Sequence, residues 1–145
     1  MSGLWTSFVA DNTTGTVLVA SSPDGVNWTG NTNIGQASAT APSVTGFDDG
    51  VNTQLYCAFV ADNGTGTVLV ASSPDGVNWT GNTNIGEASA TAPSLAPFNG
   101  QLYVAFVADN ATGTVLVASS PDGVNWTGST KIGQASATAP SLAVF

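Results

Sequence analysis

The side chains best suited to chemistry in this sequence are amides, carboxylates and hydroxyls that recur at three places. An Asp-Asn pair is followed one residue later by Thr-Gly, and a Gln or Glu stands 25 residues after each of these Asp residues. Such groups carry no fixed positive charge and can hydrogen-bond a neutral polyol such as a sugar ring. The candidate ligand-binding residues of this kind are Asp11, Asn12, Asp62, Asn63, Asp109, Asn110, Gln36, Glu87 and Gln134.

Aromatic side chains add a second set of candidates, because a ring can stack on a bound sugar. Trp5, Tyr56 and Tyr103 occupy equivalent positions in the three repeats, and a Phe follows each of them three residues later. Residues three apart face opposite sides of a strand, so the Phe is expected in the core and the Trp or Tyr on the other face. Packing between sheets accounts for the Trp and Tyr residues as well as ligand contact does. We favour packing and keep the three residues as candidates.

The composition excludes several classes of function. The net charge is −8 and Lys131 is the only cationic side chain, so neither several phosphate contacts nor a polybasic membrane site can form. The chain has no His and a single Cys57, which excludes a zinc site and an intrachain disulfide. We therefore expect no metal, no cofactor, no nucleic-acid partner and no membrane insertion.

Catalytic groups are also missing from the repeats. Serine nucleophiles would lack a His partner. A glycosidase needs two carboxylates at a defined separation, whereas Glu87 is the only Glu and Gln36 and Gln134 replace it in the other repeats. Asp48 and Asp49 occur in one repeat only and lack the spaced partners of a calcium loop. The sequence predicts that the protein is not an enzyme.

Internal repetition dominates the organisation of the chain. FVADN begins at positions 8, 59 and 106, and SSPDGVNWTG begins at 21, 72 and 119, so the repeat recurs after 51 and then 47 residues. We divide the single segment 1–145 into the units 4–54, 55–101 and 102–145. Residues 55–98 and 102–145 differ at six positions, which indicates recent duplication or deliberate choice.

Each unit has the pattern of four short antiparallel strands. Over the last part of the chain we predict strands at 93–98, 102–108, 114–118 and 125–127, with a long connection over 133–140. Four strands in about 47 residues are typical of one blade of a β-propeller. The predicted fold is an all-β propeller with three blades per chain.

The phase of the repeat predicts how such blades would close into a ring. The first hairpin lacks an inner strand, whereas the predicted inner strand from Ser141 to Phe145 has no second strand after it. Propellers close with about four to eight blades. We therefore predict a six-bladed ring of two identical chains, in which this strand completes the blade begun by the partner's N-terminal hairpin. A larger closed ring is the alternative.

The stretch SSPDGVNW resembles the Asp-box of sialidase-type propellers, although Asp and Gly are one residue closer here than in the usual box. The resemblance implies a turn between third and outer strands, with a structural role for its residues. Sialidases of this kind hold the substrate carboxylate with an arginine cluster, and this chain has no Arg. The box residues are Ser21, Asp24, Gly25, Trp28, Ser72, Asp75, Gly76, Trp79, Ser119, Asp122, Gly123 and Trp126.

The short repeated blades are also similar in kind to the propeller lectins of bacteria and fungi. The expected function is therefore multivalent carbohydrate binding in clefts between blades, without catalysis. The alternative is a structural, self-assembling propeller fragment, natural or engineered, with no selected ligand. No apolar run approaches the roughly 20 residues of a membrane helix, and residues 1–4 lack the pattern of a signal peptide. We expect a soluble chain without an export signal, whose compartment stays open.

Overall fold

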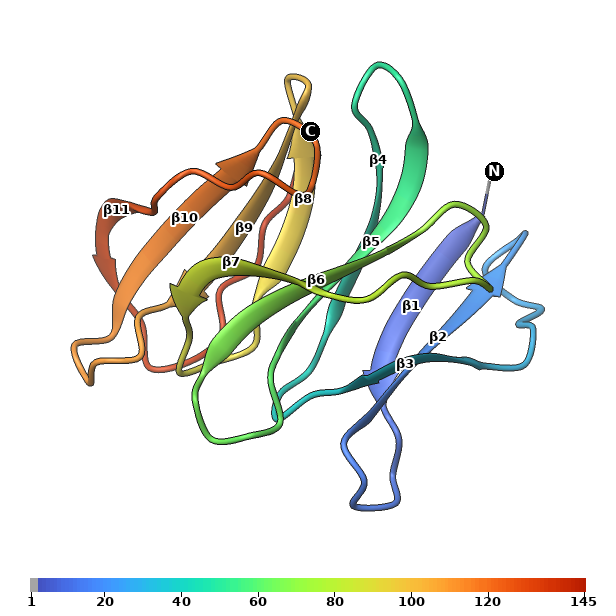
Figure 1. Cartoon of the computed structure of the whole chain (residues 1–145), viewed down its shortest axis with the longest axis horizontal. Helices are drawn as coiled ribbons and strands as arrows, with labels where there is room; N and C mark the ends of the chain where they lie inside the picture. Colours follow the sequence, from blue (N-terminus) through green and yellow to red (C-terminus); the bar gives the residue numbers. More distant parts are fainter. Residues whose placement is uncertain (1–2) are drawn as a thin grey trace.

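The chain forms three antiparallel sheets that follow one another along a row (Figure 1). The computed structural model describes residues 3–145, so Met1 and Ser2 of the predicted segment 1–145 lie outside the described residues. Residues 3–145 contain eleven strands and no helix. Within this range, accordingly, no helix is long and apolar enough to cross a membrane. The all-β prediction is confirmed.

Each sheet consists of strands that pair with their neighbours in chain order. Sheet 1 contains β1 (Leu4–Val9), β2 (Thr16–Ser22) and β3 (Thr32–Ala37). Sheet 2 contains β4 (Ser43–Asp48), β5 (Thr53–Val60), β6 (Thr67–Ser73) and β7 (Thr83–Ala88). Sheet 3 contains β8 (Ser94–Phe98), β9 (Gln101–Val107), β10 (Thr114–Ser120) and β11 (Thr130–Ala135). Among the described residues, sheet 1 therefore lacks a counterpart of β4 and β8.

The predicted position of the outer strand, residues 125–127 in the last unit, is wrong. Residues 125–129 form no strand, and the edge strand of sheet 3 is β11, which begins at Thr130. The reason is that the box turn extends further than expected. Asp122 Oδ1 accepts hydrogen bonds from the amides of Val124 and Asn125, and the indole Nε1 of Trp126 donates to the carbonyl of Gly123. Residues 124–126 therefore belong to the turn, and of the predicted strand only Thr127 donates a backbone hydrogen bond to β10, at 2.9 Å to the carbonyl of Ser119.

The core lies between the sheets. At the junction of sheets 1 and 2, Val17, Val19 and Ile34 pack with Cys57, Phe59 and Ala71. The junction of sheets 2 and 3 is built from the equivalent residues, among them Val68, Val70, Ile85, Phe106 and Ala118. Burial raises the pKa of the Cys57 thiol to about 12, as expected for a small buried hydrophobic residue. Near-identical repeats thus build the same junction twice.

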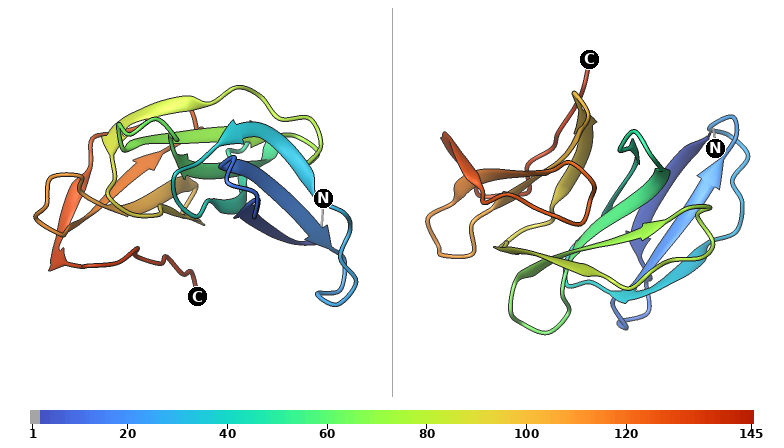
Figure 2. Two further views of the ribbon diagram at one scale, coloured as in Figure 1. Left: turned by 90° about the horizontal axis from the view of Figure 1, so that it is seen from below. Right: turned by 45° about the horizontal axis from the view of Figure 1, so that its top comes forward.

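The outer faces of the row leave the same positions uncovered. Phe8 is 37% exposed, whereas its equivalents Phe59 and Phe106 are both 0% exposed. Ile132 is 53% exposed, whereas Ile34 and Ile85 are 4% and 6% exposed. Figure 2 shows the reason, because the first hairpin and β11 lie at opposite ends of the row and have a neighbouring sheet on one side only.

Phe59→Ala tests whether the junctions carry the stability of the fold. The substitution removes a fully buried ring, so we expect the free energy of unfolding to fall by about 3–5 kcal/mol in chemical denaturation. The control Val51→Ala lies in an exposed turn and should change it by less than about 0.5 kcal/mol. Equal effects of the two substitutions would contradict a core located at the junctions.

Candidate functional site

The Asp-Asn-x-Thr-Gly segments form the hairpin turns at one edge of the molecule, the lower edge in Figure 1. In the turn between β5 and β6, Asn63 Oδ1 accepts hydrogen bonds from the amide and the hydroxyl of Thr65, at 3.1 and 2.6 Å. The Thr65 hydroxyl also bonds that of Thr67 at 2.7 Å. The Asn oxygen and the Thr hydroxyls are therefore occupied within the hairpin, and the other two turns repeat this pattern.

The Asp residue of each turn lies at the boundary with the preceding sheet. The Asp62 carboxylate sits beside Gly15, where an added Cβ would lie 2.5 Å from Oδ2, and Asp109 sits in the same way beside Gly66. Both glycines have positive φ angles, +72° and +71°, which also favour glycine. Among residues 3–145, the Asp62 and Asp109 side chains accept no hydrogen bond, so these exposed carboxylates are available to solvent. Among the described residues, no sheet precedes that of Asp11.

The Gln and Glu candidates lie in the edge strands β3, β7 and β11, rather than in the connections where we expected them. Gln36 Oε1 accepts a hydrogen bond of 2.7 Å from Asn82 Nδ2, which links sheet 1 to sheet 2. Glu87 Oε1 accepts one of 3.0 Å from the amide of Ser129, which links sheet 2 to sheet 3. Gln134 occupies the same place in β11, and residues 3–145 contain no sheet after that of β11. These side chains therefore tie neighbouring sheets together.

The candidate rings divide between packing and an open surface. Trp5 of sheet 1 covers Gly76 of sheet 2, and Tyr56 of sheet 2 covers Gly123 of sheet 3, so that a Cβ at either glycine would overlap the ring. The Tyr56 hydroxyl also donates to the carbonyl of Asp122 at 3.1 Å. Burial raises the pKa of Tyr56 above its ordinary value. In the part of the chain that the structure describes, Tyr103 of sheet 3 covers no box glycine and packs beside Phe98, with ring centroids 6.4 Å apart.

The box turns are held together by a serine that the sequence analysis missed. The hydroxyl of Ser73 donates to Asp75 Oδ1 and accepts from the amide of Gly76 at 2.8 Å. Ser22 and Ser120 do the same in the other boxes, and all three hydroxyls are buried. The assigned residues Ser21, Ser72 and Ser119 instead close the base of the turn, each by a hydroxyl contact to a Thr. Each strand ends in two adjacent serines, and the alternation of buried and exposed positions along the strand could have indicated that the second one faces inward.

Hydrogen bonds also fix the charge of the box carboxylates. In sheet 2, Asp75 accepts from the amides of Asn78 and Val77 at 2.8 Å each and from the Asn78 side chain at 2.7 Å. These bonds hold the pKa values of Asp24 and Asp75 well below the usual range. At Asp122, the hydrogen bond from the amide of Asn125 contributes most to the same lowering, and the pKa falls to about 2. The boxes thus act as anionic turn clamps with a structural role.

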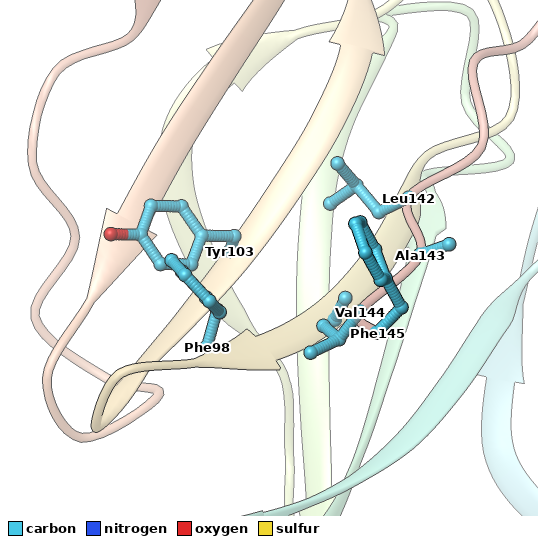
Figure 3. A pocket seen from close by; sticks show the side chains of 7 residues that line it. Phe98, Tyr103, Leu142, Ala143, Val144 and Phe145 are labelled. Atoms are coloured by element: carbon cyan, nitrogen blue, oxygen red, sulfur yellow. The ribbon is translucent and has the colours of Figure 1, made fainter.

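An apolar pocket opens at the uncovered face of sheet 3 (Figure 3). It measures about 490 Å³. Its walls come from the inner part of sheet 3 and from the C-terminal segment (residues 141–145), which returns alongside β8. The lining residues are Ala96, Phe98, Tyr103, Leu142, Ala143, Val144 and Phe145. Of the sequence candidates for ligand contact, only Tyr103 lines this pocket.

Comparison with protein-family models and with curated proteins finds no match for this chain. Within the range 3–145, no three His, Cys, Asp or Glu side chains gather closely enough to hold a metal ion. The features that remain for a functional argument are the exposed hairpin turns, the two uncovered sheet faces and the pocket.

The box carboxylates predict how stability depends on pH. A carboxylate with a lowered pKa in the folded chain stabilises the fold above its unfolded pKa, and this contribution is lost as the pH falls through the folded pKa. We expect the thermal midpoint to stay level from pH 7 to about 5 and to drop from about pH 4 towards 2. Asp75→Asn should lower the midpoint at pH 7 and flatten the acid limb. Asp62→Asn is the matched control, and an equal change in both variants would contradict the box as the origin.

Proposed function

We propose that the 145-residue chain is a self-assembling segment of a β-propeller, whose copies join through the junction that already links its own sheets. One observation carries this proposal. The junction occurs twice inside the chain, and its two halves are left uncovered at opposite ends of the row. The uncovered face of sheet 1 is equivalent to the face that sheets 2 and 3 each bury against the preceding sheet. The uncovered face of sheet 3 is equivalent to the face that sheets 1 and 2 each bury against the following sheet.

The composition of the two faces supports association. In the single chain, Leu4, Phe8 and Trp28 are exposed at the sheet 1 end of the row, and Ile132 of β11 and Val144 and Phe145 of the C-terminal segment are exposed at the other end. Exposed apolar side chains gathered on one face mark interaction sites, and their burial is the main driving force for association. The net charge of −8 with one cation cannot provide salt bridges across the faces, so contacts between neutral groups must carry the affinity. Added salt should strengthen association by screening the repulsion.

Ring closure follows from joining one face to the other. A head-to-tail contact between identical chains makes a closed ring if the rotation per chain divides a full turn. Two chains with three sheets each give six blades, within the usual range for propellers, and a larger ring is the alternative. A closed ring also removes the open end of the first sheet, where β1 lacks a neighbour on one side.

Ile132→Asp tests the assembly. Light scattering at micromolar concentration should give about 29 kDa for the native chain, twice its 14.4 kDa, and 14.4 kDa for the variant, because a charge would enter the junction. Val77→Asp is the control, since Val77 is exposed although both faces of sheet 2 are covered. It should leave the mass unchanged. A native mass of 14.4 kDa contradicts the proposal, and a higher multiple identifies the larger ring.

Carbohydrate binding without catalysis is a second candidate, and the hairpin edge supports it. Asp62 and Asp109 are exposed at sheet boundaries, and their side-chain carboxylates accept no hydrogen bond among residues 3–145. The candidate set for this activity narrows to the six turn residues Asp11, Asn12, Asp62, Asn63, Asp109 and Asn110. Gln36, Glu87, Trp5 and Tyr56 link sheets, and Gln134 and Tyr103 stand at the equivalent positions of sheet 3, where the proposed assembly would use them in the same way. Assembly would repeat this turn around one face of the ring, and linked weak sites raise apparent affinity by orders of magnitude.

A glycan array tests this second candidate. We expect the native chain to bind neutral glycans and the triple variant Asp11→Asn, Asp62→Asn, Asp109→Asn to lose the signal, because amides replace the accepting carboxylates while the hairpins keep their shape. Asp48→Asn is the control at the opposite edge of the molecule. An array without signal for the assembled native chain would remove this candidate and leave self-assembly as the function.

A further inference from the structure

The occupant of the apolar pocket can be identified from the closed junctions. Three of its lining residues are Phe98, Tyr103 and Leu142. Their equivalents one unit earlier are Phe47, Tyr56 and Leu95, and all three belong to one buried cluster together with Leu102 of β9. At the closed junction of sheets 2 and 3, Leu102 near the start of β9 therefore packs in the same cluster as the equivalents of these three pocket-lining residues.

That leucine has an exposed equivalent at the other end of the chain. Leu102 is 0% exposed and Leu55 is 3% exposed, whereas Leu4, at the start of β1, is 56% exposed. We propose that the pocket receives Leu4 of a second copy of this chain, and that β1 of that copy pairs with the C-terminal segment. This inference rests on the proposed self-assembly and adds the partner's residues and their register.

The C-terminal segment already lies where an inner strand belongs. In the closed junction, the amide of Leu95 donates to Ser43 Oγ at 3.0 Å, which joins the inner strands β4 and β8. The amide of Leu142 donates to Ser94 Oγ at the same distance, so residues 141–145 stand beside β8 as β8 stands beside β4. They are not a strand in the single chain, because no second strand pairs with them. The segment is positioned for a partner strand.

The register follows from the two complete inner pairings. Ser43 pairs with Ala58 and Val44 with Cys57 in sheet 2, and Ser94 pairs with Ala105 and Leu95 with Val104 in sheet 3. Applying the same pairing to the C-terminal segment of one copy and the start of the chain in another gives five residue pairs. They are Ser141 with Ser7, Leu142 with Thr6, Ala143 with Trp5, Val144 with Leu4, and Phe145 with Gly3. A slip of one residue would turn the side chains to the opposite face.

The side chains around the pocket meet complementary groups in this arrangement. Tyr103 would cover Gly25 of the second copy, as Tyr56 covers Gly123. Gly25 fits that role, since its φ of +78° matches the +77° of Gly123, and it is exposed whereas Gly123 is buried. Gln134 would bond Asn31 of the second copy, as Gln36 bonds Asn82. No charge is buried in these contacts, which suits a chain with one cation.

Disulfide trapping tests the register. In a Cys57→Val background, Thr6→Cys with Leu142→Cys places two thiols on directly paired residues, whose Cα separation in antiparallel strands suits a disulfide. After oxidation we expect covalent species of about 29 kDa, twice the 14.4 kDa chain, on a non-reducing denaturing gel. Leu95→Cys with Val104→Cys is the matched control, because these paired residues lie in one chain and should give an intrachain link without a change in mass.

Two further variants make the outcome decisive. Thr6→Cys with Ala143→Cys is out of register by one residue, and we expect at least about tenfold less covalent product. Leu4→Ala should weaken association at least about tenfold, because the pocket loses its apolar occupant. Retention of assembly by Leu4→Ala at native affinity would overturn Leu4 as the occupant.

The results separate this inference from the proposed function. Equal trapping at 143, or no trapping at 142 while the control pair forms and light scattering shows an oligomer, overturns the register and leaves self-assembly in place. An intrachain link between positions 6 and 142 shows that the tail folds onto its own β1 and overturns the second copy as occupant. A monomeric mass in light scattering overturns the proposed function as well.

Discussion

An aromatic ring of one sheet lies on a bare glycine in the box turn of the next, and the arrangement of the sheets depends on this contact. Trp5 on Gly76 and Tyr56 on Gly123 have the same geometry, and the space for the ring exists only because no Cβ occupies it. The box itself holds the glycine in place, since the buried hydroxyl of Ser73 binds the amide of Gly76 and Asp75 binds the amides that follow. A ring, a glycine and an anionic turn clamp together form one joint.

This joint explains why some polar candidates bond the neighbouring sheet while others stay exposed to solvent. Gln36 and Glu87 lie on edge strands, where one hydrogen bond to the next sheet adds to the apolar contact. The hairpin turns at the other edge satisfy their own amide and hydroxyl groups and leave the Asp carboxylates exposed. Structural and potential ligand-binding groups are thus separated within each unit, and assembly would use the first group without covering the second.

Much of this architecture could be predicted from the sequence because the repeats are nearly identical. The spacing of the Phe residues located the core at Phe59 and Phe106, although their equivalent Phe8 is 37% exposed. The alternation in the strands located the hairpins. The position of the outer strand could not be predicted from the pattern, since Trp126 and Thr127 are residue types enriched in strands. The hydrogen bonds of Asn125 and Trp126 in the turn go to Asp122 and Gly123, which a strand pattern does not indicate. The inward Ser of each box was missed for a related reason, because two adjacent serines differ only in the face of the strand that they occupy. The side-chain links of Gln36 and Glu87 depend on how neighbouring sheets are placed, which a local pattern does not contain.

In the proposed assembly, the two uncovered faces are the two halves of one junction that closes between copies of the chain. Amide hydrogen exchange of residues 141–145, measured by mass spectrometry on the native chain and on Ile132→Asp, tests it most directly. In the native chain, pairing with β1 of another copy should protect these amides, and the variant should exchange them as an unpaired segment does. Equally fast exchange in both proteins would show that the C-terminal segment has no strand partner, and equally slow exchange would show that its partner lies within its own chain. Either result would contradict the claim.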